Sequence, residues 1–167
     1  MLYEKRVSVG EKIRLGVIGF GVQGHFDLAT ALKVPGVELA GICDLYTGRI
    51  ENAKELYGKD LYTTRNYKEL LDRADIDAVI IATPNFTHVP QAVAAAAHGK
   101  HIMCEKPLGL HAGEVREMYR AAQAADVVHM TAFTYRFAPS MRYLKHLLQT
   151  GALGTPRHFR SQRFLDL

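Results

Sequence analysis

The fold is decided by the stretch Ile13-Arg14-Leu15-Gly16-Val17-Ile18-Gly19-Phe20-Gly21-Val22-Gln23-Gly24. Its first half is a short apolar run closed by glycines, which indicates a buried strand followed by a helix. In the pattern G-x-G-x-x-G, Gly19 permits a tight turn, Gly21 lets a pyrophosphate approach the backbone, and Gly24 lets the helix pack on the strand. The pattern alone is weak, and a plain strand-to-helix turn is the alternative. Asp44, twenty residues beyond Gly24, favours a dinucleotide-binding loop.

Apolar runs and helical patterns alternate along most of the chain. Strands are predicted at residues 13–18, 37–43, 61–64, 77–82, 101–104 and 126–133. Helices are predicted at residues 21–33, 47–57, 67–71, 87–98, 111–125 and 141–149. Such alternation predicts parallel strands joined by right-handed crossovers. The sequence therefore predicts an α/β fold with a doubly wound parallel sheet of the Rossmann type.

The predicted organisation has three parts. Residues 1–11 form a polar lead-in, and residues 12–136 form the nucleotide-binding domain. Residues 137–167 hold a connecting helix and, from Pro156 to Leu165, a pattern that reads as the first strand of a second α/β domain. A lone strand buries neither face. We therefore expect the segment beyond Gly154 to be disordered, packed back on the domain, or paired with another copy, since an unpaired strand edge favours self-association.

Composition excludes several classes of function. The chain has 167 residues, 48% hydrophobic and 23% charged, which suffice for one soluble domain with a core. Its net charge of +4 is scattered, so no nucleic-acid partner is expected. No apolar stretch is long enough to span a bilayer, and the first residues lack the pattern of a signal peptide. Cys43 and Cys104 lie in apolar runs without metal-ligand spacing, which predicts free thiols in the cytoplasm and no metal site.

Asp44 ends the second predicted strand. Its carboxylate is suited to accept hydrogen bonds from an adenosine ribose and would repel a 2′-phosphate, so NAD is favoured over NADP. The alternative is a cap for the helix that follows. Arg49 lies one helical turn further on, where it either softens the selection against NADP or faces solvent.

The loop after the fourth predicted strand reads Thr83-Pro84-Asn85-Phe86-Thr87-His88. It lies at a carboxyl end of the sheet, beside the expected nicotinamide half of a bound cofactor. Pro84 stiffens the turn, and Asn85 offers both a donor and an acceptor. Turn chemistry is the alternative for Asn85, and a surface position is the alternative for His88.

Glu105-Lys106-Pro107 follows the fifth predicted strand. Pro107 fixes φ and removes a backbone donor, which holds Lys106 at the sheet edge. A partly buried lysine beside a positively charged ring gives up its proton more readily and can exchange it with a substrate hydroxyl. The alternative for Lys106 is a surface ion pair with Glu105. Arg136, after the last predicted strand, is a candidate for binding substrate oxygens, with an ion pair that braces the sheet edge as its alternative.

These stretches resemble the Gfo/Idh/MocA family of NAD(P)-dependent oxidoreductases, which act on sugars, inositols and related polyols. The matching residues are Gly19-Phe20-Gly21-Val22-Gln23-Gly24, Asp44, Ala82-Thr83-Pro84-Asn85 with His88, Gly99-Lys100-His101, Glu105-Lys106-Pro107-Leu108, and Arg136-Phe137 with Pro139. The resemblance implies that Lys106 lies beside the nicotinamide and assists catalysis, and that the Lys106–Pro107 bond is cis. With the motifs above, the predicted cofactor shell comprises Gly19, Phe20, Gly21, Val22, Gln23, Gly24, Asp44, Arg49, Thr83, Pro84, Asn85, His88, Glu105 and Lys106.

Members of this family are much longer than this chain. Their second α/β domain carries much of the substrate pocket and the oligomer interface, and an Asp and a His there usually complete the proton relay. The resemblance therefore implies the cofactor-binding half of an NAD(P)-dependent oxidoreductase acting on a sugar, inositol or related polyol hydroxyl. Its full-length parent is expected to be a homo-oligomer, and the chain alone to be inactive. Two alternatives stay open: a stand-alone NAD-binding sensor or partner module, and a reductase of a non-sugar substrate.

Overall fold

The computed structural model of the chain describes residues 12–162 and 164, so the predicted lead-in of residues 1–11 lies outside the described part. The chain divides between Ala132 and Phe133 into two compact units. The larger unit contains the sheet and the predicted nucleotide loop, and the smaller unit contains one longer helix.

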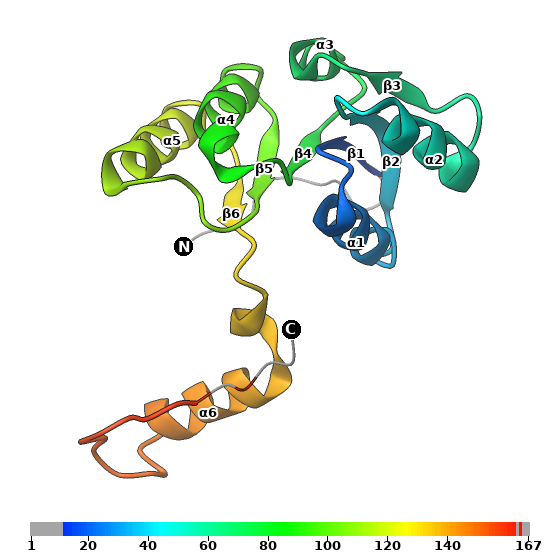
Figure 1. Cartoon of the computed structure of the whole chain (residues 1–167). Coiled ribbons are helices and arrows are strands. Elements are labelled where there is room, and N and C mark those ends of the chain that lie inside the picture. Colours follow the sequence, from blue (N-terminus) through cyan, green and yellow to red (C-terminus); the bar gives the residue numbers. More distant parts are fainter. Residues whose placement is uncertain (1–11, 163, 165–167) are drawn as a thin grey trace. The chain divides into compact units, whose positions relative to one another are not determined.

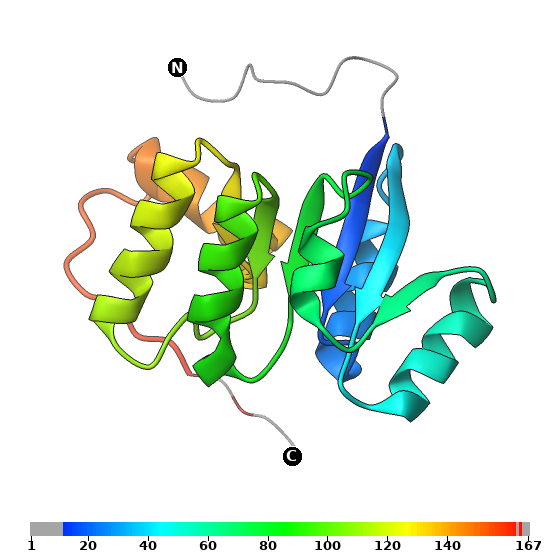
Figure 2. The same cartoon turned by 90° about the horizontal axis from the view of Figure 1, so that it is seen from above.

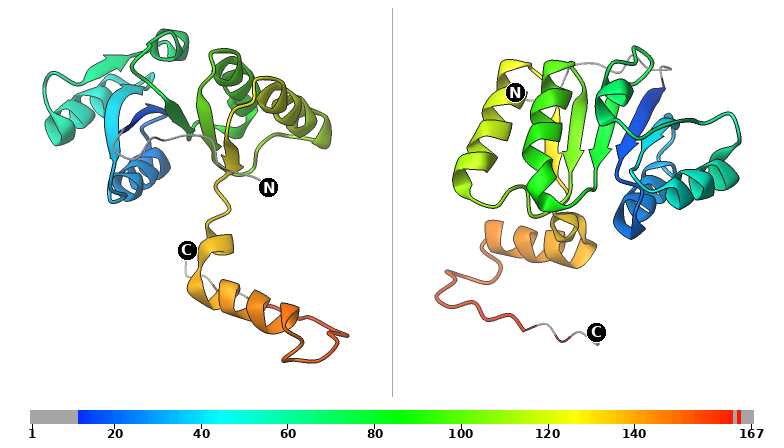
Figure 3. Two further views of the ribbon diagram at one scale, coloured as in Figure 1. Left: turned by 180° about the vertical axis from the view of Figure 1, so that it is seen from behind. Right: turned by 45° about the horizontal axis from the view of Figure 1, so that its top comes forward.

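The larger unit is built on one sheet of six parallel strands. The strands are β1 (Ile13–Ile18), β2 (Val37–Cys43), β3 (Tyr62–Thr64), β4 (Ala78–Ile81), β5 (His101–Cys104) and β6 (His129–Thr131). They lie in the order β3-β2-β1-β4-β5-β6 and run in the same direction (Figure 3). The doubly wound parallel sheet predicted from the sequence is confirmed. Its strand order reverses between β1 and β4, and such a switch point is where open α/β sheets bind ligands.

Helices cover both faces of this sheet. They are α1 (Val22–Ala31), α2 (Thr47–Tyr57), α3 (Tyr67–Leu71), α4 (His88–Ala97) and α5 (Ala112–Ala124), with a short 3-10 helix, η1 (Asn85–Thr87), before α4. Figure 1 shows α3, α4 and α5 on one face of the sheet and α1 on the other. Helices α4 and α5 run side by side in Figure 2.

Two apolar clusters, one on each face of the sheet, form the core. Alternate residues of β4 divide between them, because Val79 and Ile81 pack in one cluster and Ile80 packs in the other. Leu28 of α1 and Ala53 of α2 join Ile80, and all five side chains are no more than 2% exposed. A strand covered on both faces must be apolar throughout, which explains the unbroken apolar sequence of β4.

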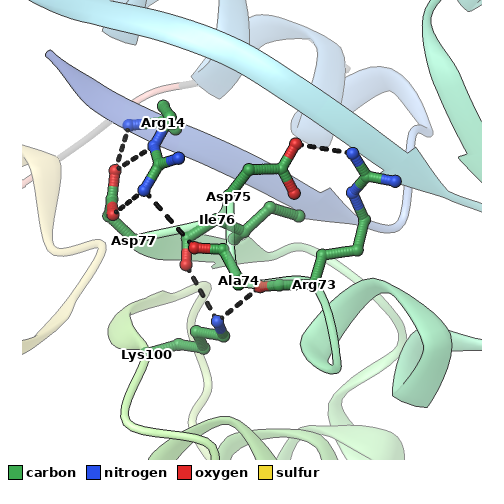
Figure 4. A network of polar contacts seen from close by, with 7 residues as sticks. All are labelled: Arg14, Arg73, Ala74, Asp75, Ile76, Asp77 and Lys100. Carbon is green, nitrogen blue, oxygen red and sulfur yellow. Dashed lines mark hydrogen bonds and ion pairs between the residues drawn. The ribbon is translucent and has the colours of Figure 1, made fainter.

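A polar network fixes the amino edge of the sheet (Figure 4). The Arg14 guanidinium donates to Asp77 Oδ1 at 2.8 Å, and the backbone N–H of Arg14 donates to Asp77 Oδ2 at 2.8 Å. Lys100 is 8% exposed, and its Nζ donates to the carbonyl oxygens of Arg73 at 2.7 Å and Ile76 at 2.9 Å. Hydrogen bonding to Arg14 lowers the pKa of Asp77, and burial lowers the pKa of Lys100. These contacts join the segments that precede β4 and β5 to β1, at the edge opposite the predicted ligand site.

The smaller unit contains η2 (Thr134–Phe137) and α6 (Pro139–Gln149). No residue of α6 is buried. Residues 156–162 and 164 are exposed and form no strand, so the strand predicted from Pro156 to Leu165 is absent from its described part; residues 163 and 165–167 lie outside the described residues. A strand needs a partner to bond its backbone, and none is formed there. The predicted self-association through this segment stays a prediction. Among the helices of the described residues, none has the length and apolar character needed to cross a membrane.

Candidate nucleotide-binding site

The carboxyl ends of four neighbouring strands meet at one edge of the sheet. Ile18 at the end of β1 pairs with Cys43 of β2 and with Ile81 of β4, and Ile81 pairs with Cys104 of β5. The segments that follow these four residues are the glycine loop, Asp44, the turn at residues 82–88 and the turn at residues 105–107. The fold thus gathers at one edge the motifs that the sequence places far apart.

Steric constraints assign separate roles to the three loop glycines. Gly19 has a φ of +93°, and a Cβ there would lie 2.7 Å from the carbonyl oxygen of Ala82. A Cβ at Gly24 would overlap the carbonyl oxygen of Gly19, so folding requires glycine at both positions. At Gly21 the nearest atoms to a Cβ belong to the Arg49 guanidinium, 3.6 Å away, which is an ordinary contact. Packing therefore does not require Gly21, which is the N-cap residue of α1, at the helix end where backbone N–H groups can bind a phosphate.

Asp44 is buried at the end of β2, with its side chain 3% exposed. Its Oδ2 accepts the backbone N–H of Phe20 at 2.7 Å, and its Oδ1 accepts the backbone N–H of Tyr46 at 2.9 Å. It does not cap α2, because Tyr46 occupies the N-cap position and no side chain bonds there. Asp44 therefore braces the glycine loop, and its predicted contact with a ribose stays a prediction.

Arg49 lies beside Asp44 rather than pointing only into solvent. Its Nη1 is 3.4 Å from Asp44 Oδ2, and its guanidinium is 4.7 Å from the centre of the Tyr46 ring, although the side chain is 48% exposed. Two apolar side chains next to the site are also open to solvent: Val22, which begins α1, is 93% exposed, and Leu45, which follows Asp44, is 66% exposed. A site edge of this kind, with a cation and exposed apolar groups, suits a nucleotide.

His88 is buried, with 1% of its surface exposed. Its Nε2 lies 2.8 Å from the carbonyl oxygen of Thr83, and its Nδ1 lies 2.9 Å from the carbonyl oxygen of Pro107. The alternative interpretation of His88 as a surface histidine is therefore wrong. The ring is also not open to a cofactor, so it is not placed for the direct contact that was predicted. The physical reason is that both ring nitrogens face backbone carbonyls inside the protein.

Hydroxyl hydrogen bonds stabilise the rest of the turn after β4, one of them to Gln91 of α4. Thr83 Oγ1 donates to Gln91 Oε1 at 2.6 Å, and Thr87 Oγ1 donates to Thr83 Oγ1 at 2.8 Å. Pro84 is exposed, and Asn85 begins η1 with its side chain partly exposed. Contacts of Thr83, Pro84 and Asn85 with a cofactor stay predictions.

The Lys106–Pro107 peptide bond is cis, as the resemblance implied. Glu105 is 6% exposed, and its N–H donates to the carbonyl oxygen of Ile81 at 2.9 Å. Its Oε2 accepts the backbone N–H of Lys106 at 2.9 Å, so the carboxylate holds the backbone of the lysine. Lys106 itself is exposed, and the expectation of a partly buried lysine is wrong for this structure, because β5 ends two residues earlier and the turn leaves the sheet.

Asp27 is a buried acidic residue that the sequence analysis missed. It is 7% exposed on α1; its Oδ1 accepts from Gln23 Nε2 at 2.8 Å, whereas its Oδ2 is buried with no hydrogen-bond partner among the described residues. Burial raises the pKa of Asp27, and the charge of Glu105 raises it further, while Lys106 opposes this shift. The sequence could have indicated Asp27 as a site residue, because it lies three residues after Gly24, on the same face of the helix.

Both cysteines, Cys43 and Cys104, lie in the core of the larger unit. Both are free thiols, and burial raises the pKa of each to about 12. In the part of the chain that the structure describes, no group of three or more His, Cys, Asp or Glu residues is placed to hold a metal ion.

Arg136 lies exposed in η2 of the smaller unit, and its predicted contact with substrate stays a prediction.

Comparison with known proteins gives consistent matches. The model of a family described as "Oxidoreductase family, NAD-binding Rossmann fold" (GFO_IDH_MocA) matches residues 13–133. Levoglucosan dehydrogenase of Pseudarthrobacter phenanthrenivorans is 41% identical over 104 residues, which cover 62% of this chain and 27% of that protein. Myo-inositol 2-dehydrogenase of Thermotoga maritima is 32% identical over 151 residues, which cover 89% of this chain and 44% of that protein.

A solved structure shows the same fold. Scyllo-inositol dehydrogenase from Lactobacillus casei, with bound NAD(H) and scyllo-inositol, superimposes with a TM-score of 0.80 at 29% identity. The match covers 86% of this chain and 43% of that chain. This chain therefore spans less than half the length of each of these three relatives.

Proposed function

This chain belongs to the Gfo/Idh/MocA oxidoreductase family, and from that premise we propose that it is the cofactor-binding half of an oxidoreductase acting on CH–OH groups. The substrate class that we propose is a sugar, an inositol or a related polyol. Support for this class comes from the relatives, which are named as levoglucosan and inositol dehydrogenases. The activity belongs to the whole protein, of which the chain supplies the part described above.

The observation that carries the proposal is that packing does not require a glycine at position 21. Packing explains why Gly19 and Gly24 are glycines, but it leaves Gly21 unexplained unless a ligand approaches the backbone there. The free N–H groups and positive dipole end of α1 suit the pyrophosphate of a dinucleotide at this position. Val22 and Arg49 would then border the pyrophosphate, and Asp44 would lie toward the adenosine ribose.

We propose NAD rather than NADP as the cofactor. Asp44 places a negative charge at the end of β2, where the 2′-hydroxyl of an adenosine ribose is expected, and this charge disfavours a 2′-phosphate. Arg49, 3.4 Å from that carboxylate, offsets part of the repulsion, so the discrimination should be moderate. The relative from Lactobacillus casei contains NAD(H), which agrees with this choice but does not decide it.

Lys106 is the proposed catalytic residue. Its exposed side chain begins at the carboxyl end of β5, where the nicotinamide half of the cofactor is expected. When bound, the nicotinamide ring supplies the hydride acceptor or donor. The Lys106 amine would exchange a proton with the substrate hydroxyl, and Glu105 would hold its backbone in place. Arg136 is the proposed contact for substrate oxygens.

Titration of the chain with NAD and with NADP by calorimetry tests this function. We expect NAD to bind and NADP to bind more weakly. Absence of binding by both nucleotides, in protein shown to be folded by circular dichroism, would reject the proposal. Equal affinity for the two would leave a dinucleotide site but reject the assignment of NAD.

A further inference from the structure

His88 connects two turns of the site that are distant in sequence. Its Nε2 lies 2.8 Å from the Thr83 carbonyl oxygen, in the turn after β4. Its Nδ1 lies 2.9 Å from the Pro107 carbonyl oxygen, in the turn after β5, nineteen residues further along the chain. Because the ring is 1% exposed, water does not compete for either contact. The imidazole therefore lies buried between the two turns, and because a neutral ring has one N–H, it donates to one of the two carbonyls at a time. We call this arrangement the His88 bridge.

The Lys106 turn is held on both sides of the lysine. On the amino side, Glu105 Oε2 accepts the Lys106 N–H at 2.9 Å, and Glu105 N–H donates to Ile81 at 2.9 Å. On the carboxyl side, the next carbonyl group, that of Pro107, faces His88 Nδ1. Between these two points the lysine has a fixed backbone and a free side chain. The Glu105 contact joins adjacent residues, whereas the Pro107 contact depends on His88 of α4.

The His88 end of this bridge is itself fixed by its neighbours. Thr83, whose carbonyl oxygen faces Nε2, is held through its hydroxyl by Gln91, which is 8% exposed. The hydroxyl of Thr87 donates to Thr83 Oγ1 and is 2.7 Å from the Pro84 carbonyl oxygen. The first turn of α4 and the turn after β4 thus form one hydrogen-bonded body. The contact of His88 with Pro107 joins this body to the residue that follows Lys106.

We propose that His88 is a positioning residue for Lys106, acting through the Pro107 carbonyl and not by touching the cofactor. The proposal rests on the proposed function, in which Lys106 lies beside the nicotinamide. It assigns His88 a role that differs from ligand contact. Loss of the bridge should free the Lys106 turn while leaving the glycine loop and Asp44 as they are.

The test compares His88→Phe with His98→Phe. Phenylalanine keeps a ring of similar size at position 88 but removes both nitrogens. His98 is the matched control, because its Nδ1 also faces a backbone carbonyl, that of Ala94 at 2.7 Å, but it lies at the far end of α4. If His88→Phe does not fold, His88→Gln replaces it, since its amide reaches one carbonyl at a time.

Binding of two ligands distinguishes a positioning role of His88 from general damage to the fold. In the proposed function NAD would contact both halves of the predicted site, whereas ADP-ribose lacks the nicotinamide. His88→Phe should weaken NAD affinity about threefold to tenfold, the range for loss of one hydrogen bond, and leave ADP-ribose affinity unchanged. His98→Phe should leave both affinities unchanged. An equal loss for both ligands, or no loss for NAD, would overturn the proposal.

Hydrogen exchange gives a readout that needs no ligand. Amide exchange in the segment 105–110 should become about tenfold faster in His88→Phe, with the glycine-loop peptide unchanged. Imidazole added to His88→Ala should restore slow exchange, because it can occupy the vacated space and contact the same two carbonyls. Unchanged exchange in segment 105–110 would refute the bridge. If the wild-type chain binds no nucleotide, the proposed function fails, and this exchange experiment still decides the role of His88.

Discussion

The carboxylate of Asp44 accepts the backbone N–H of Phe20 at 2.7 Å, so a side chain at the end of β2 holds the loop that follows β1. The same carboxylate accepts the N–H of Tyr46 at 2.9 Å. An ionised carboxylate has about four acceptor positions, so these two bonds and the 3.4 Å contact with Arg49 leave one for a ribose. Asp44 thus joins the structural role of bracing the loop to the proposed role of selecting the nucleotide.

Substitution of Asp44 should therefore change both stability and binding. Asp44→Ala leaves the buried N–H of Phe20 and the part-buried N–H of Tyr46 without their acceptor, so the free energy of unfolding should fall by about 1–3 kcal/mol. NAD affinity should fall about tenfold or more, because a charged acceptor for the ribose is lost. Urea unfolding and calorimetry measure the two effects, with the exposed Asp60→Ala as control. Equal NAD affinity for wild type and Asp44→Ala would remove Asp44 from the site.

Arg49 should affect the choice between NAD and NADP. Its guanidinium lies 3.4 Å from Asp44 and is the cation nearest to Gly21 in the described site. Because its side chain is 48% exposed, the effect should be small: Arg49→Ala should raise the preference for NAD over NADP roughly twofold to fivefold. Parallel titrations with the two nucleotides measure this ratio, and the exposed Arg120→Ala serves as control. If the ratio of NAD affinity to NADP affinity is unchanged in Arg49→Ala, Arg49 lies outside the adenosine site.

Lys100 should matter for stability and not for binding. Its Nζ donates to the carbonyl oxygens of Arg73 and Ile76 at the amino edge, away from the glycine loop. Lys100→Met leaves these buried acceptors unpaired, so the free energy of unfolding should fall by about 2–4 kcal/mol. NAD affinity of the folded protein should stay the same. Lys68→Met, at an exposed position of α3, is the control for urea unfolding. A large loss of NAD affinity in Lys100→Met would contradict the separation of the two edges.

The sheet could be predicted from the sequence because its signals are local. Apolar runs such as Val79 to Ile81 and the glycine pattern specify strands, turns and their order without long-range information. The brace of Arg14, Asp77 and Lys100 could not be predicted, because its hydrogen bonds join residues up to 63 positions apart. The burial of His88 was missed for the same reason, since its partner Pro107 belongs to another turn.

Asp27 should make stability depend on pH in a defined direction. Burial raises its folded-state pKa, so the folded protein favours the protonated carboxyl. The stabilisation that the Asp27 carboxyl contributes is fully present at pH values below the ordinary aspartate pKa. It is lost as the pH rises through the raised folded-state pKa. Asp27→Asn mimics the protonated form and still accepts from Gln23, so it should be more stable than wild type near neutral pH. The difference should vanish toward acidic pH.

Urea unfolding between pH 4 and pH 8 measures this dependence. Asp77→Asn is the matched opposite case, because hydrogen bonding to Arg14 lowers the pKa of Asp77. The folded-state contribution of Asp77 is present above the ordinary aspartate pKa and is lost as pH falls through its lowered value. Asp77→Asn should therefore be less stable than wild type at neutral pH. An Asp27→Asn variant that is destabilised at neutral pH would show that Asp27 is held in its charged form.

We propose that the pyrophosphate of NAD approaches the backbone at Gly21, and the Gly21→Ala variant tests this proposal most directly. Gly21 has φ −78° and ψ −167°, which alanine also adopts, and its Cβ would lie 3.6 Å from Arg49. The free energy of unfolding should therefore stay within about 0.5 kcal/mol of wild type. Calorimetric titration with NAD should show affinity weakened about tenfold or more, since the methyl group would occupy the phosphate's place. A stable Gly21→Ala variant that binds NAD as tightly as wild type would contradict the claim.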